Sequence, residues 1–355
     1  MTRASMASDT RAADAESDTR AQPVTETAPR RTLLDVQNLH TVFDKDGGDV
    51  HAVNQVSFDV REGEILAIVG ESGSGKSITA MSLLRLIPSP PGQIVGGRVM
   101  FNGEDLLDLG DEQIRQLRGR DIAMIFQEPM TSLNPSLRIG HQLAEPLRVH
   151  GSVPKHQIRE RCLELLRQVR LGDPEKRLDA YPHELSGGMR QRVMIAMGLA
   201  CLPKLLIADE PTTALDVTVQ AQILELLRDL VHANHSSMML ITHDLGVVAR
   251  YADRINVMYA GRIVERGTAE DIFHRPKHPY TLGLMESMPR LDQAPGSRLT
   301  PIPGQPPDLS DPPPGCPFHP RCRFAEARCR SERPPLEQLT DEHWKACWVD
   351  TDAKR

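Results

Sequence analysis

The chain has 355 residues, which is enough for one main domain and a smaller appended unit, because single domains usually have about 100–200 residues. Its 48 acidic residues outnumber its 42 basic ones, and the net charge of −6 argues against broad electrostatic binding of nucleic acid or anionic lipid. No apolar run comes near the ~20 residues that cross a bilayer, so we expect a cytosolic protein that can dock on a membrane protein.

Residues 1–31 are rich in Ala, Thr, Arg and Asp and show no hydrophobic periodicity, which predicts a disordered tail. Beyond them, short apolar runs predict β-strands at 33–42, 55–60, 65–69, 98–101, 122–126, 205–208, 238–241 and 255–258. The runs of continuous Ile, Leu and Val are typical of a parallel sheet that is covered on both faces.

Two regions interrupt or follow this pattern. Residues 137–180 show helical spacing of apolar side chains, clearest at 158–169, and predict a helical insert within an α/β core. After about residue 270 the composition changes, and residues 295–335 are crowded with Pro and Cys. Such a segment cannot form long helices or central strands, so we expect a separate C-terminal unit.

A glycine-rich loop, called the phosphate loop below, follows the predicted strand at 65–69 and precedes helix-like residues 78–86. It consists of Gly70-Glu71-Ser72-Gly73-Ser74-Gly75-Lys76-Ser77. Glycines permit the positive φ angles that let backbone N–H groups close around phosphate oxygens, while Lys76 provides a positive charge and Ser77 a hydroxyl ligand for Mg²⁺. The loop therefore predicts a binding site for a nucleoside triphosphate.

Two adjacent acids end another apolar strand, in Leu205-Leu206-Ile207-Ala208-Asp209-Glu210. A strand of an open α/β sheet places such residues at its carboxyl end, the edge that also carries the phosphate loop. Asp209 suits coordination of Mg²⁺, directly or through water, and Glu210 suits polarising the water that attacks the γ-phosphate. Alone this pair is a weak signal, but together with the loop it indicates nucleotide hydrolysis.

A third motif, Leu185-Ser186-Gly187-Gly188-Met189-Arg190-Gln191, opens a helix-like segment that stops at Pro203. The free N–H groups and the dipole at a helix N-terminus favour an anion. An ordinary helix cap uses the same residue types, so the residues alone leave both interpretations open.

Together these motifs resemble, in order, those of the nucleotide-binding subunits of ATP-binding cassette (ABC) transporters. The resemblance identifies the phosphate loop with Walker A, Gln127 with the Q-loop, 185–191 with the signature, 205–210 with Walker B, Ala214-Leu215-Asp216 with the D-loop and His243 with the switch histidine. Met189 departs from the commonest signature, which has Gln there. The resemblance implies an α/β fold: a P-loop NTPase (RecA-like) core at 32–270 with an antiparallel β subdomain and a helical subdomain at about 128–190.

The resemblance also implies a head-to-tail pair of cassettes that binds and hydrolyses ATP. Each ATP would lie between the Walker A loop of one cassette and the Ser186, Gly187 and Gly188 of the other, which supply donors and exclude water. The implied catalytic residues are Glu210, His243 and Gln127. The implied Mg²⁺ contacts are Ser77, Gln127 and Asp209.

Other nucleotide contacts follow from the same resemblance. Within the loop they fall on Gly70, Ser72, Gly73, Ser74, Gly75, Lys76 and Ser77, and beyond it on Thr79 and Asp216. Phe43 is similar to the aromatic residue that stacks on adenine, although an ordinary core phenylalanine explains it equally well.

Three further segments resemble the oligopeptide and dipeptide permease branch of ABC importers. They are Glu128-Pro129-Met130-Thr131-Ser132-Leu133-Asn134-Pro135, His278-Pro279-Tyr280-Thr281 and Cys316-Pro317-Phe318-His319-Pro320-Arg321-Cys322. They imply an ATPase subunit that energises uptake of di- or oligopeptides, or of nickel complexes or glutathione. Its partners would be a second ABC ATPase subunit, a paralogue or itself, with two transmembrane permease subunits and an extracytoplasmic solute-binding protein. It would lie on the cytoplasmic face of the inner membrane.

Four cysteines gather near the C-terminus: Cys316, Cys322, Cys329 and Cys347. Disulfides are disfavoured in a cytosolic ATPase, and four thiols in a Pro-rich unit too small for a core suggest a metal. The spacing lacks the Cys-x2-Cys pairs of common zinc sites, and the permease branch is similar in carrying a [4Fe-4S] cluster, so we expect iron-sulfur, with zinc as the alternative. Residues 271–355 are thus predicted to form a Cys-rich, metal-binding domain of the oligopeptide-permease type.

Two other functions remain as alternatives. A soluble ABC ATPase of translation or DNA maintenance usually carries two cassettes or long inserts, and the negative net charge disfavours nucleic acid as a partner. The second alternative, a redox-sensing regulator, is supported by the cysteines alone. The ATPase activity of such a regulator would change with the oxidation state of the cluster.

Overall fold

The structure, a computed structural model, describes residues 30–45, 48–127, 132–213, 215–288 and 301–351. Three predicted features fall outside these residues: most of the tail (1–29), Ala214 of the D-loop and Glu128 to Thr131 after the Q-loop. The chain from residue 31 onward forms one compact unit.

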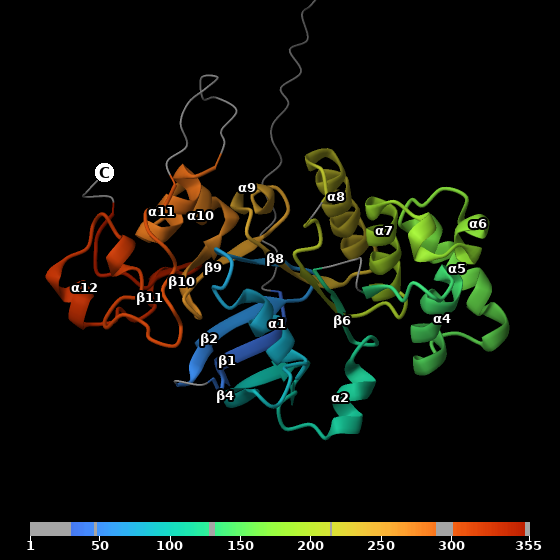
Figure 1. The fold of residues 1–355 in the computed structure, drawn as a ribbon, viewed down its shortest axis with the longest axis horizontal. Helices are drawn as coiled ribbons and strands as arrows, with labels where there is room; N and C mark the ends of the chain where they lie inside the picture. Colours follow the sequence, from blue (N-terminus) through green and yellow to red (C-terminus); the bar gives the residue numbers. More distant parts are fainter. Residues whose placement is uncertain (1–29, 46–47, 128–131, 214, 289–300, 352–355) are drawn as a thin grey trace, which may run out of the picture. The chain divides into compact units, whose positions relative to one another are not determined.

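Within the described residues, the larger of two sheets has eight strands in the order β11-β12-β10-β9-β3-β8-β7-β6 (Figure 1). Its parallel part consists of β6 (Ile122–Ile125), β7 (Leu205–Asp209), β8 (Ser237–Thr242), β3 (Ile65–Val69) and β9 (Arg254–Tyr259). The sheet continues antiparallel through β10 (Arg262–Thr268), β12 (His343–Lys345) and β11 (Glu337–Thr340).

Alternate residues of the central strands enter hydrophobic cores on opposite faces of this sheet. Leu205 and Ile207 of β7 share one core with α1 (Lys76–Leu83) and the smaller sheet. Leu206 of the same strand lies in the other core, with α7 (Gly187–Gly198) and α8 (Val217–Ala233). Both faces are therefore covered, which is why the strand sequences are apolar without alternation.

The smaller sheet is antiparallel and has the order β2-β1-β4-β5. Its strands are β1 (Thr32–Phe43), β2 (Val50–Arg61), β4 (Gly92–Phe101) and β5 (Glu104–Asp105). Strands β2 and β4 begin earlier than the predicted 55–60 and 98–101. The reason is that pairing with β1 continues through polar and glycine residues, such as Gly96 opposite His40, where the hydrophobic pattern is weak.

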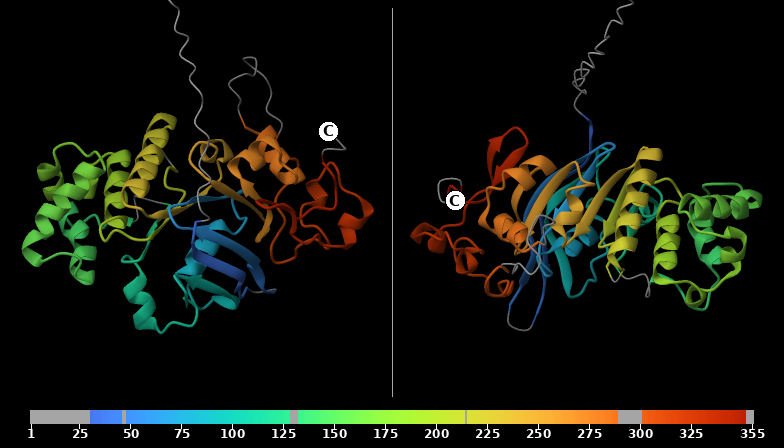
Figure 2. Two further views of the ribbon diagram at one scale, coloured as in Figure 1. Left: turned by 180° about the vertical axis from the view of Figure 1, so that it is seen from behind. Right: turned by 90° about the horizontal axis from the view of Figure 1, so that it is seen from above.

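The predicted helical insert contains α4 (Ile139–His150), α5 (Ile158–Gln168) and α6 (Pro174–Asp179), with a 3₁₀ turn at Lys155–Gln157, and a second 3₁₀ turn, Pro182–Glu184, follows it. Leu143 and Leu147 of α4 pack with Leu163 and Leu166 of α5 in one buried core, as their helical spacing predicts. These helices lie beyond the β6 edge of the sheet in each view (Figures 1 and 2).

The remaining helices are α2 (Asp111–Leu117), α9 (Leu245–Val248), α10 (Ala269–His274), α11 (Pro279–Glu286) and α12 (Ala327–Ser331), with a 3₁₀ turn at His319–Arg321. Among the helices of the described ranges, none has the length and apolarity needed to span a membrane.

The C-terminal segment is built onto the large sheet through strand β10. Glu265 and Arg266 of β10 pair with Lys345 and Trp344 of β12. The Glu265 carboxylate is fully buried and accepts a hydrogen bond from the His343 ring nitrogen Nε2 at 2.8 Å. The Arg266 guanidinium lies 3.8 Å from the centre of the Trp344 ring. The sheet is therefore continuous across the domain boundary that the sequence predicts near residue 270.

Candidate functional site

The phosphate loop connects β3 to α1 at the carboxyl end of the parallel strands. Gly73 and Gly75 have left-handed backbones with φ angles of 77° and 103°. A Cβ atom on Gly75 would lie 2.3 Å from the Ala52 carbonyl oxygen, and one on Gly70 would lie 2.2 Å from that of Met258. Only glycine fits at Gly70 and Gly75, and the curled backbone is of the kind that turns N–H groups toward an anion.

Lys76 holds its charge inside the loop. The residue is only 4% exposed, and its Nζ donates hydrogen bonds to the carbonyl oxygens of Gly70 at 2.8 Å and Glu71 at 2.9 Å. Burial lowers the pKa of the ammonium, and the nearby carboxylates oppose that shift. The Ser74 hydroxyl is buried in the same loop without a hydrogen-bond partner among the described residues. A phosphate fits this environment because it would supply the missing acceptor and a counter-charge.

Ser77 and Asp209 meet where α1 begins and β7 ends. The Ser77 hydroxyl donates a hydrogen bond to Asp209 Oδ1 at 2.9 Å. Burial raises the pKa of the Asp209 carboxyl, and the Ser77 bond opposes that shift. A hydroxyl and a carboxylate are oxygen ligands of the type that Mg²⁺ prefers, and a cation here would favour the ionised carboxylate. The residues present therefore fit a Mg²⁺ site.

The Glu210 carboxylate contacts Gln127 and His243, the other two residues to which the sequence assigns catalytic roles. Its Oε2 accepts hydrogen bonds from Gln127 Nε2 at 3.0 Å and from the Thr213 hydroxyl at 2.9 Å. His243 Nδ1 lies 3.3 Å from the other carboxylate oxygen, Oε1. The backbone of Glu210 is left-handed, with φ of 45°, and its N–H donates to the Ile241 carbonyl at 2.9 Å. Sequence reasoning missed Thr213, whose only signal was its position three residues after Glu210.

The predicted signature residues gather at a different place. The Ser186 hydroxyl caps α7 by accepting a hydrogen bond from the Met189 N–H at 3.4 Å. Asp216 caps α8 by accepting one from the Val219 N–H at 3.0 Å, and a Cβ atom on Gly188 would lie 3.1 Å from a Val219 methyl carbon. Helix α7 packs on α4, α5, α8 and β6, whereas α1 packs on β1, β2 and β7. In the described structure, the helix that follows the signature residues and the helix that follows the phosphate loop thus pack against different helices and strands.

Phe43 and Thr79, two other residues predicted to contact the nucleotide, contact neighbouring residues of the fold. Phe43 ends β1, opposite Val50 and Gly92, and is half-buried. Thr79 is fully buried in α1, where its hydroxyl donates to the Gly75 carbonyl at 2.9 Å. Their contacts with a nucleotide stay predictions.

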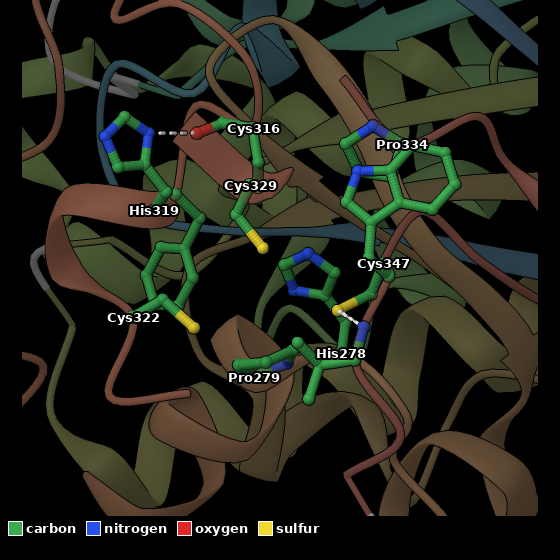
Figure 3. Close-up of a pocket in the computed structure, with 11 residues that line it drawn as sticks. His278, Pro279, Cys316, His319, Cys322, Cys329, Pro334 and Cys347 are labelled. Atoms are coloured by element: carbon green, nitrogen blue, oxygen red, sulfur yellow. Dashed lines mark hydrogen bonds between the residues drawn. The ribbon is translucent and has the colours of Figure 1, made fainter. Parts of the chain in front are cut away.

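The C-terminal thiols correct one prediction. A small hollow is lined by the side chains of Cys316, Cys322, Cys329, Cys347, His278 and His319 (Figure 3). Within the described residues, no group of three or more His, Cys, Asp or Glu side chains is arranged to hold a metal ion. The predicted [4Fe-4S] cluster, and with it the description of this unit as metal-binding, is therefore wrong, and the zinc alternative fails on the same finding.

The physical reason lies in how the thiols are surrounded. Burial raises the pKa of Cys322 to about 11 and that of Cys347 to about 12, so in the absence of a metal both are neutral thiols near pH 7. The Cys347 sulfur accepts a hydrogen bond from the Val349 N–H at 3.4 Å. The hollow has a volume of ≈ 10 Å³, room for about one water molecule. Spacing along the chain indicated that the cysteines gather, but not that they form a ligand set.

Two family models match the chain. Residues 53–213 match the model described as ABC transporter, and residues 264–329 match the one described as the C-terminal region of oligopeptide/dipeptide transporters. The dipeptide transport ATP-binding protein DppD of Bacillus subtilis is 53% identical over 317 residues, covering 89% of this chain and 94% of the relative. The oligopeptide transport ATP-binding protein OppD of Escherichia coli is 52% identical over 316 residues, covering 89% and 93%.

Solved structures resemble the fold as well. A dimeric ATP-binding cassette in a post-hydrolysis state with ADP and phosphate has a TM-score of 0.60 and 28% identity, covering 66% of this chain and 98% of that one. The cbiO1 protein of Clostridium perfringens, part of an ABC transporter complex, has a TM-score of 0.59 and 27% identity, covering 69% and 92%. These similarities confirm the predicted P-loop α/β fold.

Proposed function

The chain belongs to the ABC transporter family, in its oligopeptide/dipeptide branch, and on that premise we propose that it hydrolyses ATP to drive import of di- and oligopeptides. One observation carries the proposal: the phosphate loop, Asp209 and Glu210 converge at one edge of the sheet in a chain that also has the peptide-transporter C-terminal region. The relatives are named for peptide transport, which disfavours a soluble ATPase of translation or DNA maintenance.

In the proposed reaction, Lys76 and the loop N–H groups bind the phosphates of ATP. Ser77 and Asp209 would hold Mg²⁺, with Gln127 as a further ligand, and the ion, when bound, would neutralise charge on the phosphates. Two hydrogen bonds fix Oε2 of Glu210, which leaves Oε1 to accept a proton from the attacking water. His243 lies beside Oε1 and would contact the γ-phosphate.

A family member of this kind works as a dimeric ATPase with membrane permease partners. We propose that Ser186, Gly187, Gly188 and Asp216 of one cassette complete the site of the other, which agrees with the different helices and strands on which α7 and α1 pack within one chain. The second subunit would be identical or a paralogue. We further propose two permease subunits and an extracytoplasmic solute-binding protein, with this chain on the cytoplasmic face of the inner membrane.

The domain limits are part of the proposal. We assign residues 32–270 to the nucleotide-binding domain, with its helical subdomain at about 128–190, and residues 271–355 to a C-terminal domain of the oligopeptide-permease type. The solute within the peptide class is set by partners that recognise it.

Partner capture tests the transport proposal. The Glu210→Gln variant, incubated with Mg-ATP in native membranes, is expected to co-purify with two polytopic membrane proteins identified by mass spectrometry. The Lys76→Ala variant serves as the control for nucleotide dependence. Recovery of ribosomes or DNA-repair factors in place of membrane proteins would refute import and leave the ATPase assignment intact.

Thr213→Ala should slow hydrolysis without weakening ATP binding. The substitution removes the hydroxyl that fixes Glu210 Oε2, so the carboxylate keeps only the Gln127 bond on that oxygen. We expect turnover to fall by about tenfold, since one hydrogen bond to a charged group is worth ~1.5–3 kcal/mol. Steady-state ATPase assays check this, with Thr213→Ser, which keeps the hydroxyl, as the matched control. Equal turnover of the two variants would contradict the role.

A further inference from the structure

Glu71, the second residue of the phosphate loop, is held from the C-terminal region by two side chains. The hydroxyl of Tyr280, in α11, accepts a hydrogen bond from the Glu71 N–H at 2.8 Å. The Arg321 guanidinium donates one hydrogen bond to each carboxylate oxygen of Glu71, at 2.6 and 2.9 Å. Both the backbone and the side chain of this loop residue are therefore fixed by residues distant in sequence.

The two side chains are themselves held in place. Tyr280 is fully buried and the Arg321 side chain is 5% exposed. The centre of the Tyr280 ring lies 4.6 Å from that of the Tyr259 ring, and Arg321 Nε donates to the Pro303 carbonyl at 2.9 Å. A buried charge that loses its partner is costly, so Arg321 strongly disfavours any loop conformation in which Glu71 moves away.

Glu71 is also a partner of the loop lysine. Its carbonyl oxygen accepts a hydrogen bond from Lys76 Nζ at 2.9 Å. The residue clamped by Tyr280 and Arg321 is thus one of the two whose carbonyls hold the lysine charge in the loop. A continuous set of contacts runs from the C-terminal region to the group that would meet the phosphates.

We infer that Tyr280 and Arg321 are positioning residues that preorganise the phosphate loop through Glu71, an inference that rests on the proposed ATP site. A loop already ordered before ATP arrives loses less conformational entropy on binding, so its affinity is higher. These contacts are made to the phosphate loop and not to Glu210 or its partners Gln127 and Thr213. They therefore affect nucleotide affinity and leave the hydrolytic step unchanged.

The test measures ATP affinity and turnover separately in the full-length chain. Arg321→Gln, Glu71→Gln and Tyr280→Phe are each expected to weaken binding of a fluorescent ATP analogue by about tenfold, with kcat within about twofold of the wild type. Arg321→Lys, which keeps the charge, should recover part of the loss. The double variant Glu71→Gln with Arg321→Gln should bind about as well as either single variant, because both remove the same contact.

Arg323→Gln is the matched control, because Arg323 lies two residues from Arg321 and forms an exposed ion pair with Glu286 at 2.8 Å. It should bind ATP like the wild type. Thermal unfolding without nucleotide shows that each variant is folded, and Tyr280→Phe, which keeps its ring in the core, carries the test if an arginine variant is not. Unchanged affinity in Glu71→Gln and Tyr280→Phe, or multiplying losses in the double variant, would overturn the inference. A wild-type chain that binds no ATP would instead overturn the proposed function itself.

Discussion

Lys76→Ala is expected to weaken ATP binding by about a hundredfold and to abolish hydrolysis at ordinary ATP concentrations. The ammonium is buried beside the carboxylates of Asp209 and Glu210, which electrostatically oppose the burial-induced fall in its pKa. Without it, the bound phosphates would face two acids and lose a charge-assisted hydrogen bond worth ~1.5–3 kcal/mol. Isothermal titration calorimetry with ATP and Mg²⁺ measures the loss directly.

A surface lysine provides the control for this experiment. Lys204 is half-exposed and lies 3.9 Å from Asp121, outside the phosphate loop, so Lys204→Ala should leave affinity unchanged. If Lys76→Ala binds ATP as tightly as Lys204→Ala does, the loop does not bind the phosphates in the way proposed.

Glu210→Gln is expected to keep ATP affinity and to reduce turnover by about a thousandfold, within the range for loss of a general base. The amide keeps the size of the side chain, and its oxygen can still accept from Gln127 and Thr213, but it cannot take a proton from water. Because ATP then persists between the paired cassettes, the variant should elute as a dimer with ATP and as a monomer without it. ATPase assays and size-exclusion chromatography with light scattering provide the two readouts.

An exposed acid on α8 provides the control for the loss of a negative charge. Glu225 lies 3.8 Å from Arg228, and Glu225→Gln should hydrolyse ATP at the wild-type rate. Substantial turnover by Glu210→Gln would show that another group, or water alone, acts as the base.

The sequence predicted best what depends on local pattern. The five residues of β3 are all buried, and their unbroken apolar run indicates a central parallel strand. Glycine, lysine and serine in the loop carry their chemistry in their identity and spacing, so Lys76 and Ser77 could be selected without coordinates. The structure adds that Ser77 meets Asp209 and that Glu210 meets Gln127 and His243.

Contacts that depend on distant parts of the chain could not be read in this way. Strands β11 and β12 are short and follow the Pro-rich residues 295–335, and they form because β10 offers an edge with which β12 can pair. Arg321 lies 250 residues from Glu71, and nothing in either local sequence marks the pair. The cysteines failed as a prediction for a related reason, since a shared location in the sequence does not decide whether the side chains are arranged as a set of metal ligands.

The continuity of the sheet through β10 and β12 has a consequence for shortened forms of the chain. A protein ending near residue 270 would leave the outer edge of β10 without a neighbour, and Glu265 would lose His343 and the backbone N–H of His278, which donates to it at 2.9 Å. Uncovered strand edges pair with one another and promote aggregation. Insolubility of such a fragment would therefore report an exposed strand edge and would say nothing about whether the C-terminal residues take part in hydrolysis.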